Sequence, residues 1–220
     1  MDKTMEVNKN EVRERIEKVE GVRLEFENEK VIESYDEYSF PPIILKYDFD
    51  EKLEDKIKLN NSEKIINKEK LVDYLKKLND WFFIQLREII FVADEKDLKT
   101  AELHNGQRVC EHLKKDHLAV RVYTENTLVI NVKKLKEEAR KIEEELIYSS
   151  FKQELNRAII TTLLHELGHQ LLAVPLLTTK ELEKIFVVDL SGYDLREGEE
   201  EIVEEFAINY FRKNRVWILK

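Results

Sequence analysis

The chain has 220 residues, of which 42% are hydrophobic and 38% are charged, so it can bury a substantial core. Its formal net charge of −9 and the lack of a basic tract argue against nucleic acid as a partner. The single cysteine excludes an internal disulfide and, with a charged N-terminal stretch unlike a signal peptide, predicts a cytoplasmic protein.

Alternation of apolar and polar residues predicts a β-rich module at the start of the chain. Three strands are expected there, over residues 22–26, 31–35 and 43–49. The first two flank Asn28-Glu29-Lys30 and predict a hairpin, whereas Asn60-Asn61-Ser62 is typical of a junction. We therefore expect an N-terminal module over residues 1–62 and a larger domain over residues 63–220.

The larger domain begins with one helix and three strands. Asn67 is a typical N-cap for a helix that runs to about Gln85, and the apolar run 88–93 is typical of a buried strand. Residues 118–123 and 127–132 are separated by a short polar turn and predict a second hairpin.

Three helices are expected after this hairpin. Asn131 is a plausible cap for a charged helix over residues 133–147. Ser150, followed by a glutamine three residues later, starts a longer helix that ends at Pro175. Polar residues interrupt this helix, which argues against a membrane span. A last helix covers residues 198–213.

The most informative motif is His165-Glu166-Leu167-Gly168-His169, which reads H-E-x-x-H within the longer helix. Residues four apart share one face of a helix, so both imidazoles reach the same point. Two neutral imidazoles supply half of a tetrahedral zinc site, and Glu166 is placed to take a proton from a zinc-bound water. Gly168 costs roughly 1 kcal/mol relative to alanine, so we expect a strand or a substrate to approach it closely.

Such a site needs a third protein ligand. No histidine follows His169, and the only methionines are Met1 and Met5. A site with three histidines above a Met-turn is therefore excluded, and the third ligand is expected to be a carboxylate.

The acidic start of the last helix is the main source of carboxylates. On a helical wheel, Glu200 shares an edge with the apolar residues of that helix and is the best ligand candidate. Glu204 lies one turn later and is expected to hydrogen-bond a ligand histidine, or to replace Glu200. Glu201, which points further towards solvent, and Asp194 in the preceding segment are alternative ligands.

The two motifs, His165-Glu-Leu-Gly-His169 and Glu200-x-x-Val-Glu-Glu-Phe-Ala207, together resemble the gluzincins. The likeness is greatest to the ImmA/IrrE-type metallopeptidases and the compact archaeal minigluzincins, and it covers roughly residues 85–215. It implies that His165, His169 and Glu200 bind Zn²⁺ and that Glu166 is the general base.

The resemblance also implies an α+β, zincin-like fold. A small mixed sheet would pack on the active-site helix and on a C-terminal ligand helix, beside the β-rich N-terminal module. In zincins, the strand before the active-site helix often forms the cleft edge and pairs with an extended substrate. Residues 127–132 are our candidate for that strand.

We expect a zinc-dependent metalloendopeptidase that acts on a protein or peptide and has no nucleic-acid or membrane partner. The alternative is a non-catalytic or latent zincin-fold regulatory protein that binds one cognate partner, its cleft blocked by the N-terminal module or by the tail 216–220. Cys110, His112 and His117 form a weaker second metal candidate. Abundant Lys, Glu and Ile with few Gln, Met and Cys resemble the composition of thermophile proteins.

Overall fold

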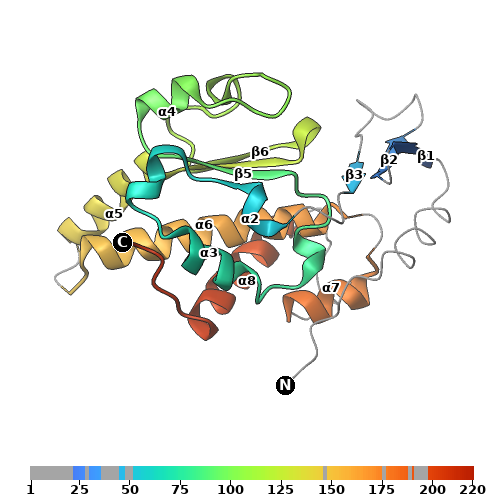
Figure 1. Ribbon diagram of the computed structural model, residues 1–220. Helices are drawn as coiled ribbons and strands as arrows, with labels where there is room; N and C mark the ends of the chain where they lie inside the picture. Colours follow the sequence, from blue (N-terminus) through green and yellow to red (C-terminus); the bar gives the residue numbers. More distant parts are fainter. Residues whose placement is uncertain are drawn as a thin grey trace.

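The computed structural model shows a mixed α+β protein in which helices cover both faces of a small sheet (Figure 1). The residues that it describes are 22–27, 30–35, 45–47, 52–145, 148–174, 177–187, 190 and 198–220. Within these ranges, no helix combines the length and the apolar sequence needed to cross a membrane.

The sheet of the larger unit has the strand order β4, β5, β7, β6. Its strands are β4 (Ile57–Lys58), β5 (Glu88–Val92), β6 (Ala119–Val122) and β7 (Thr127–Asn131). β5 runs parallel to both β4 and β7, whereas β6 and β7 form the antiparallel hairpin that the sequence predicts. β7 therefore lies inside the sheet, and β6 is an edge strand among the strands that the structure describes. The prediction that residues 127–132 form the cleft edge is wrong.

Successive side chains of the central strands point to opposite faces, as the two-residue period of a strand requires. Ile89 and Phe91 of β5 belong to the main core, whereas Ile90 and Val92 belong to a second apolar cluster. The main core lies between the sheet and the long helix α6 (Phe151–Leu172). The second cluster lies under α4 (Glu95–Thr100), on the other face of the sheet (Figure 1).

The remaining helices begin and end as follows: α2 Leu53–Lys56, α3 Lys68–Leu75, α5 Val132–Glu145, α7 Thr179–Phe186 and α8 Glu199–Lys213. Short 3₁₀ turns cover Asn60–Lys64, Asp80–Phe82, Val109–Glu111 and Tyr123–Glu125. The predicted caps are confirmed at α3, α5 and α6, where side-chain oxygens of Asn67, Asn131 and Ser150 accept from backbone amides.

The helix predicted from Asn67 to about Gln85 is too long. α3 ends at Leu75, and the side chain of Asn79 then accepts a hydrogen bond from the Trp81 amide at 3.0 Å. Asparagine competes in this way with helical hydrogen bonding. The chain turns here and directs both Trp81 and Phe82 into the core, with 4% and 1% of their surface exposed.

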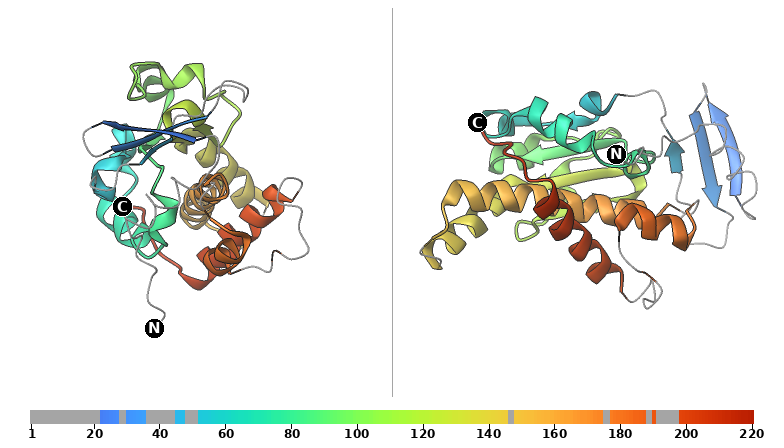
Figure 2. Two further views of the ribbon diagram at one scale, coloured as in Figure 1. Left: turned by 90° about the vertical axis from the view of Figure 1, so that its right-hand side faces the viewer. Right: turned by 90° about the horizontal axis from the view of Figure 1, so that it is seen from below.

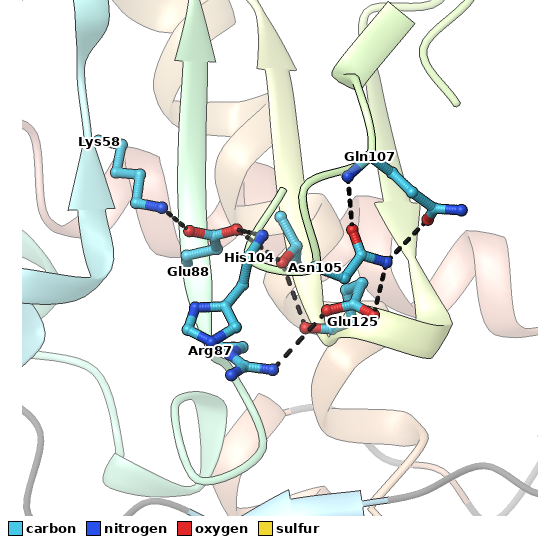
Figure 3. Close-up of polar contacts among 8 residues, drawn as sticks. Lys58, Arg87, Glu88, His104, Asn105, Gln107 and Glu125 are labelled. Carbon is cyan, nitrogen blue, oxygen red and sulfur yellow. Dashed lines mark hydrogen bonds and ion pairs between the residues drawn. The ribbon is translucent and has the colours of Figure 1, made fainter. Parts of the chain in front are cut away.

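The buried carboxylate of Glu88, at the start of β5, holds a loop over the end of the sheet (Figure 3). It pairs with Lys58 of β4 and accepts a hydrogen bond from the backbone amide of His104 at 3.1 Å. In the same loop, the Asn105 amide group donates to Glu125 at 2.9 Å. The contacts with Lys58 and His104 compensate for the burial of the Glu88 carboxylate. Together with the bond between Asn105 and Glu125, they fix the loop that follows α4.

Three strands precede this unit and form an antiparallel sheet in the order β1, β2, β3. They are β1 (Val22–Glu27), β2 (Lys30–Tyr35) and β3 (Leu45–Tyr47), at the positions that the sequence predicts. The division into two units, with its boundary at residue 62, stays a prediction. Ile57 of β4 and Leu59, which precede that boundary, belong to the main core.

Candidate metal site

The H-E-x-x-H motif lies in the C-terminal half of α6, and its two histidines occupy one face of the helix. The Nε2 atoms of His165 and His169 lie 3.0 Å apart, with the rings nearly perpendicular at 78°. Their side chains are 23% and 13% exposed, so both nitrogens meet near the surface of a largely buried helix.

α8 crosses α6 at the motif and brings a carboxylate to the histidines (Figure 2). The two carboxylate oxygens of Glu200 lie 3.4 Å from the Nε2 atoms of His165 and His169, respectively. Ligands placed 2.0–2.1 Å from a tetrahedral zinc ion are about 3.3 Å apart, so the spacing of the three side chains is close to that of a tetrahedral zinc site. Across the described ranges, this is the one group of three such donors close enough to share a metal ion.

Glu199 orients one of these histidines. Nδ1 of His169 lies 2.6 Å from a carboxylate oxygen of Glu199. Because an ionised carboxylate only accepts hydrogen bonds, this contact favours the tautomer that has its proton on Nδ1 and its lone pair on Nε2, beside Glu200. A carboxylate behind a ligand histidine fixes the ring and raises its basicity.

The sequence predicts this supporting role for Glu204, but in the described structure the contact to His169 is made by Glu199. Glu204 is exposed and makes no hydrogen bond to either histidine, whereas Glu199 does. The sequence feature that indicates Glu199 is its spacing. It lies four residues before the buried Val203, so the two side chains share one face of α8. Glu201 is exposed one residue beyond Glu200, and Asp194 lies outside the described residues.

Gly168 allows the two helices to approach closely enough to assemble the group. A Cβ atom at this position would lie 2.9 Å from Cγ1 of Val203 and 3.0 Å from its Cβ atom. The close approach that the glycine predicts is therefore made by helix α8, and not by a strand. The side chain of Val203 packs directly on Gly168, and this contact brings α8 close to the histidines.

Burial shifts the pKa values of two residues in the motif. Burial, followed by the neighbouring His169, lowers the pKa of His165, which favours the neutral imidazole that metals bind. Burial also raises the pKa of Glu166 above its ordinary value of 4.5, against the opposing charges of His169 and Arg121. A carboxylate with a raised pKa is a better base near neutral pH.

A groove of about 510 Å³ runs beside the motif, between α6, α8 and the start of β6. The residues that line it are His117, Leu118, Ala119, Arg157, Thr161, Thr162, His165, Glu166, Glu204, Ala207 and Ile208. Apolar and hydroxyl side chains form most of the wall, and His165 and Glu166 of the motif also line it. The groove thus joins an edge strand to the cluster of histidines and carboxylates.

The C-terminal tail packs elsewhere on the molecule. The side chain of Asn156 donates to the carbonyl of Val216 at 2.8 Å and accepts from the amide of Ile218 at 2.9 Å. Leu219 then forms an isolated bridge with Ile66. Residues 216–220 are not among those that line the groove, so the idea that the tail blocks it is not supported.

The second metal candidate is not assembled. Cys110 is exposed, and His112 and His117 do not come together with it as a group of donors in the described part of the chain.

Comparisons of the chain with protein-family models, curated proteins and solved structures found no match.

Proposed function

We propose that this chain is a zinc-dependent metallopeptidase with a zincin-like active site. The observation that carries the proposal is the spacing of three donor groups: two histidine nitrogens 3.0 Å apart and one carboxylate 3.4 Å from each. Two imidazoles and a carboxylate form a ligand set that leaves a fourth tetrahedral position open. Structural zinc sites are closed by four protein ligands, so this set favours catalysis.

Zinc bound to these residues would supply a Lewis acid and lower the pKa of a bound water towards about 7. Glu166 lies in the groove next to His165, where it can remove a proton from the attacking water. The same carboxylate then delivers the proton to the leaving amine. Glu199 holds His169 in the required tautomer throughout.

The edge of β6 provides a template for an extended peptide. The carbonyl of Leu118 accepts from the Asn131 amide at 2.8 Å, so this pair is hydrogen-bonded within the hairpin. Because hydrogen bonds alternate along an antiparallel pair, the backbone groups of Ala119 and Arg121 point away from β7. An extended substrate can bind these groups and lie along the groove towards Glu166.

The test is cleavage of unstructured peptides by the zinc-loaded protein and by its Glu166→Gln variant. Glutamine keeps the size of the side chain but cannot accept the proton, so hydrolysis should fall by at least about 100-fold, while zinc content stays unchanged. The matched control is Glu201→Gln, on an exposed side chain of the same acidic segment. Equal cleavage by the Glu166→Gln variant and the unaltered protein would refute the mechanism.

The competing idea, a zincin-fold protein that binds one cognate partner, predicts a different result. Such a protein would bind zinc but cleave no peptide in a broad library, and Glu166→Gln would leave binding of the partner intact. Cleavage that depends on Glu166 would exclude it.

A further inference from the structure

Arg121 is a buried cation beside His165, His169 and Glu200. The sequence motifs do not identify it. It belongs to β6, is only 9% exposed, and its side chain is on the face of the strand that covers α6. One guanidinium nitrogen donates to the carbonyl of His169 at 3.1 Å. Arg121 thus connects the edge strand of the groove directly to a candidate zinc ligand.

The hydrogen bond is made at the end of α6, where carbonyl groups carry partial negative charge. The His169 carbonyl also accepts from the amide of Ala173 at 3.1 Å, so it has two donors. A cation placed here stabilises the last turn of the helix. That turn carries the second histidine of the motif, and its position sets where the Nε2 atom lies.

The other contacts of Arg121 hold the guanidinium in one orientation. Its centre lies 4.3 Å from the centre of the Tyr123 ring, within the range of a cation–π contact. Burial lowers the pKa of Arg121, and the negative charges of Glu199 and Glu166 oppose this shift. Its Nε atom is buried and has no hydrogen-bond partner within the described ranges, so the group is held by this limited set of contacts.

We propose that Arg121 is a positioning residue that couples the substrate-binding edge of β6 to the His169–Glu199 pair. Its backbone groups point away from β7, along the edge of β6, and its side chain donates to the carbonyl of the histidine that Glu199 contacts. The proposal rests on the proposed zinc site. Lysine can reproduce only part of this role, because an ammonium group carries the charge but lacks the planar shape that stacks on Tyr123 and the fixed directions of several donors.

The experiment measures zinc affinity by chelator competition and the visible spectrum of the Co²⁺-loaded protein. Both are recorded for the unaltered chain, Arg121→Gln and Arg121→Lys. Loss of a group that supports a metal ligand typically weakens metal binding by about 10–100-fold, and we expect this for Arg121→Gln, together with a shifted Co²⁺ spectrum. Arg121→Lys keeps the charge and should recover part of the affinity.

The matched control is Arg87→Gln, which removes an arginine paired with Glu125, away from the groove (Figure 3). It should leave zinc affinity and the Co²⁺ spectrum unchanged. Unaltered affinity and spectrum in both Arg121 variants would overturn the proposal while leaving the zinc site intact. If Arg121→Gln does not fold, the same two readouts on Arg121→Lys decide the question. If the unaltered chain binds no zinc, the proposed function and this inference fail together.

Discussion

Gly168→Ala tests whether close helix packing assembles the metal site. The added Cβ atom would lie 2.9 Å from Cγ1 of Val203, whereas apolar carbons in contact are about 3.5–4.0 Å apart. α8 must therefore move away from α6 by roughly 0.5–1 Å. Glu200 moves with it, and its distance of 3.4 Å from each histidine nitrogen increases by a similar amount.

The variant should lose zinc affinity, whereas the stability of the metal-free protein should change only modestly. Alanine is better than glycine in a helix by about 1 kcal/mol, and overpacking costs about 1–3 kcal/mol, so the metal-free protein changes by only about 0–2 kcal/mol. Zinc tolerates deviations of only about 0.2 Å in its bonds, so a displaced third ligand should weaken binding at least about tenfold. Urea unfolding without metal and chelator competition measure the two effects separately.

Val203→Ala is the companion variant. It removes the two methyl groups, one of which the new Cβ atom would contact, at a cost of roughly 1.6 kcal/mol in lost burial before any cavity term. Combined with Gly168→Ala, it should restore part of the zinc affinity, although the Cβ contact at 3.0 Å remains. Wild-type zinc affinity in the single Gly168→Ala variant would show that the packing of α6 on α8 does not position the ligand.

Three further outcomes are expected. Burial raises the pKa of Glu166 above its ordinary value of 4.5, so the contribution of this side chain to stability is present below pH 4.5 and is lost as pH rises through the folded pKa. Glu166→Gln should therefore raise the Tm of the metal-free protein at about pH 7.5. The difference should shrink towards zero below pH 4.5, and a constant difference would contradict burial as the cause. Glu199→Gln should weaken zinc binding by about 10–100-fold, because the amide orients His169 less well. Chelator competition measures this beside the control variant Glu205→Gln, which alters an exposed side chain of the same helix. Equal zinc affinities of the two variants would show that Glu199 does not orient His169. Asn156→Ala should destabilise the protein by about 2–3 kcal/mol in urea unfolding, because two hydrogen bonds of a buried side chain to the tail are lost, while zinc affinity stays unchanged. A smaller effect would mean that the tail contributes little.

Local sequence signals predicted much of the secondary structure. The caps at Asn67, Asn131 and Ser150 act within one helical turn, so their geometry depends on a few neighbouring residues. The hairpin of β6 and β7 is equally local. α7 was not predicted, although Thr178 and Glu181 form a capping box at its start.

Strand order was harder to predict, because it depends on contacts between distant residues. β7 pairs with β5 in parallel, so β7 lies inside the described sheet and β6 lies at its edge. Both strands have similar apolar sequences, so pattern alone did not distinguish the interior strand from the edge strand.

The same limit applies to the site. The histidine spacing is a property of one helix, and it predicted that the two imidazoles meet. The choice among glutamates depends on how α8 crosses α6, which Gly168 and Val203 determine together. A helical wheel of α8 alone therefore identified Glu200 as a candidate but missed Glu199. Arg121 comes from a different element, and no spacing rule links it to the motif.

The most direct test of the zinc site is the metal content of the purified chain beside its Glu200→Ala variant, with Glu201→Ala as the control on the neighbouring exposed carboxylate. Both the unaltered protein and the Glu201→Ala variant should contain one zinc ion per chain. The Glu200→Ala variant should lose zinc on dialysis, because two histidines alone do not complete the site. Full zinc content in the Glu200→Ala variant, or none in the unaltered protein, would contradict the ligand set of His165, His169 and Glu200.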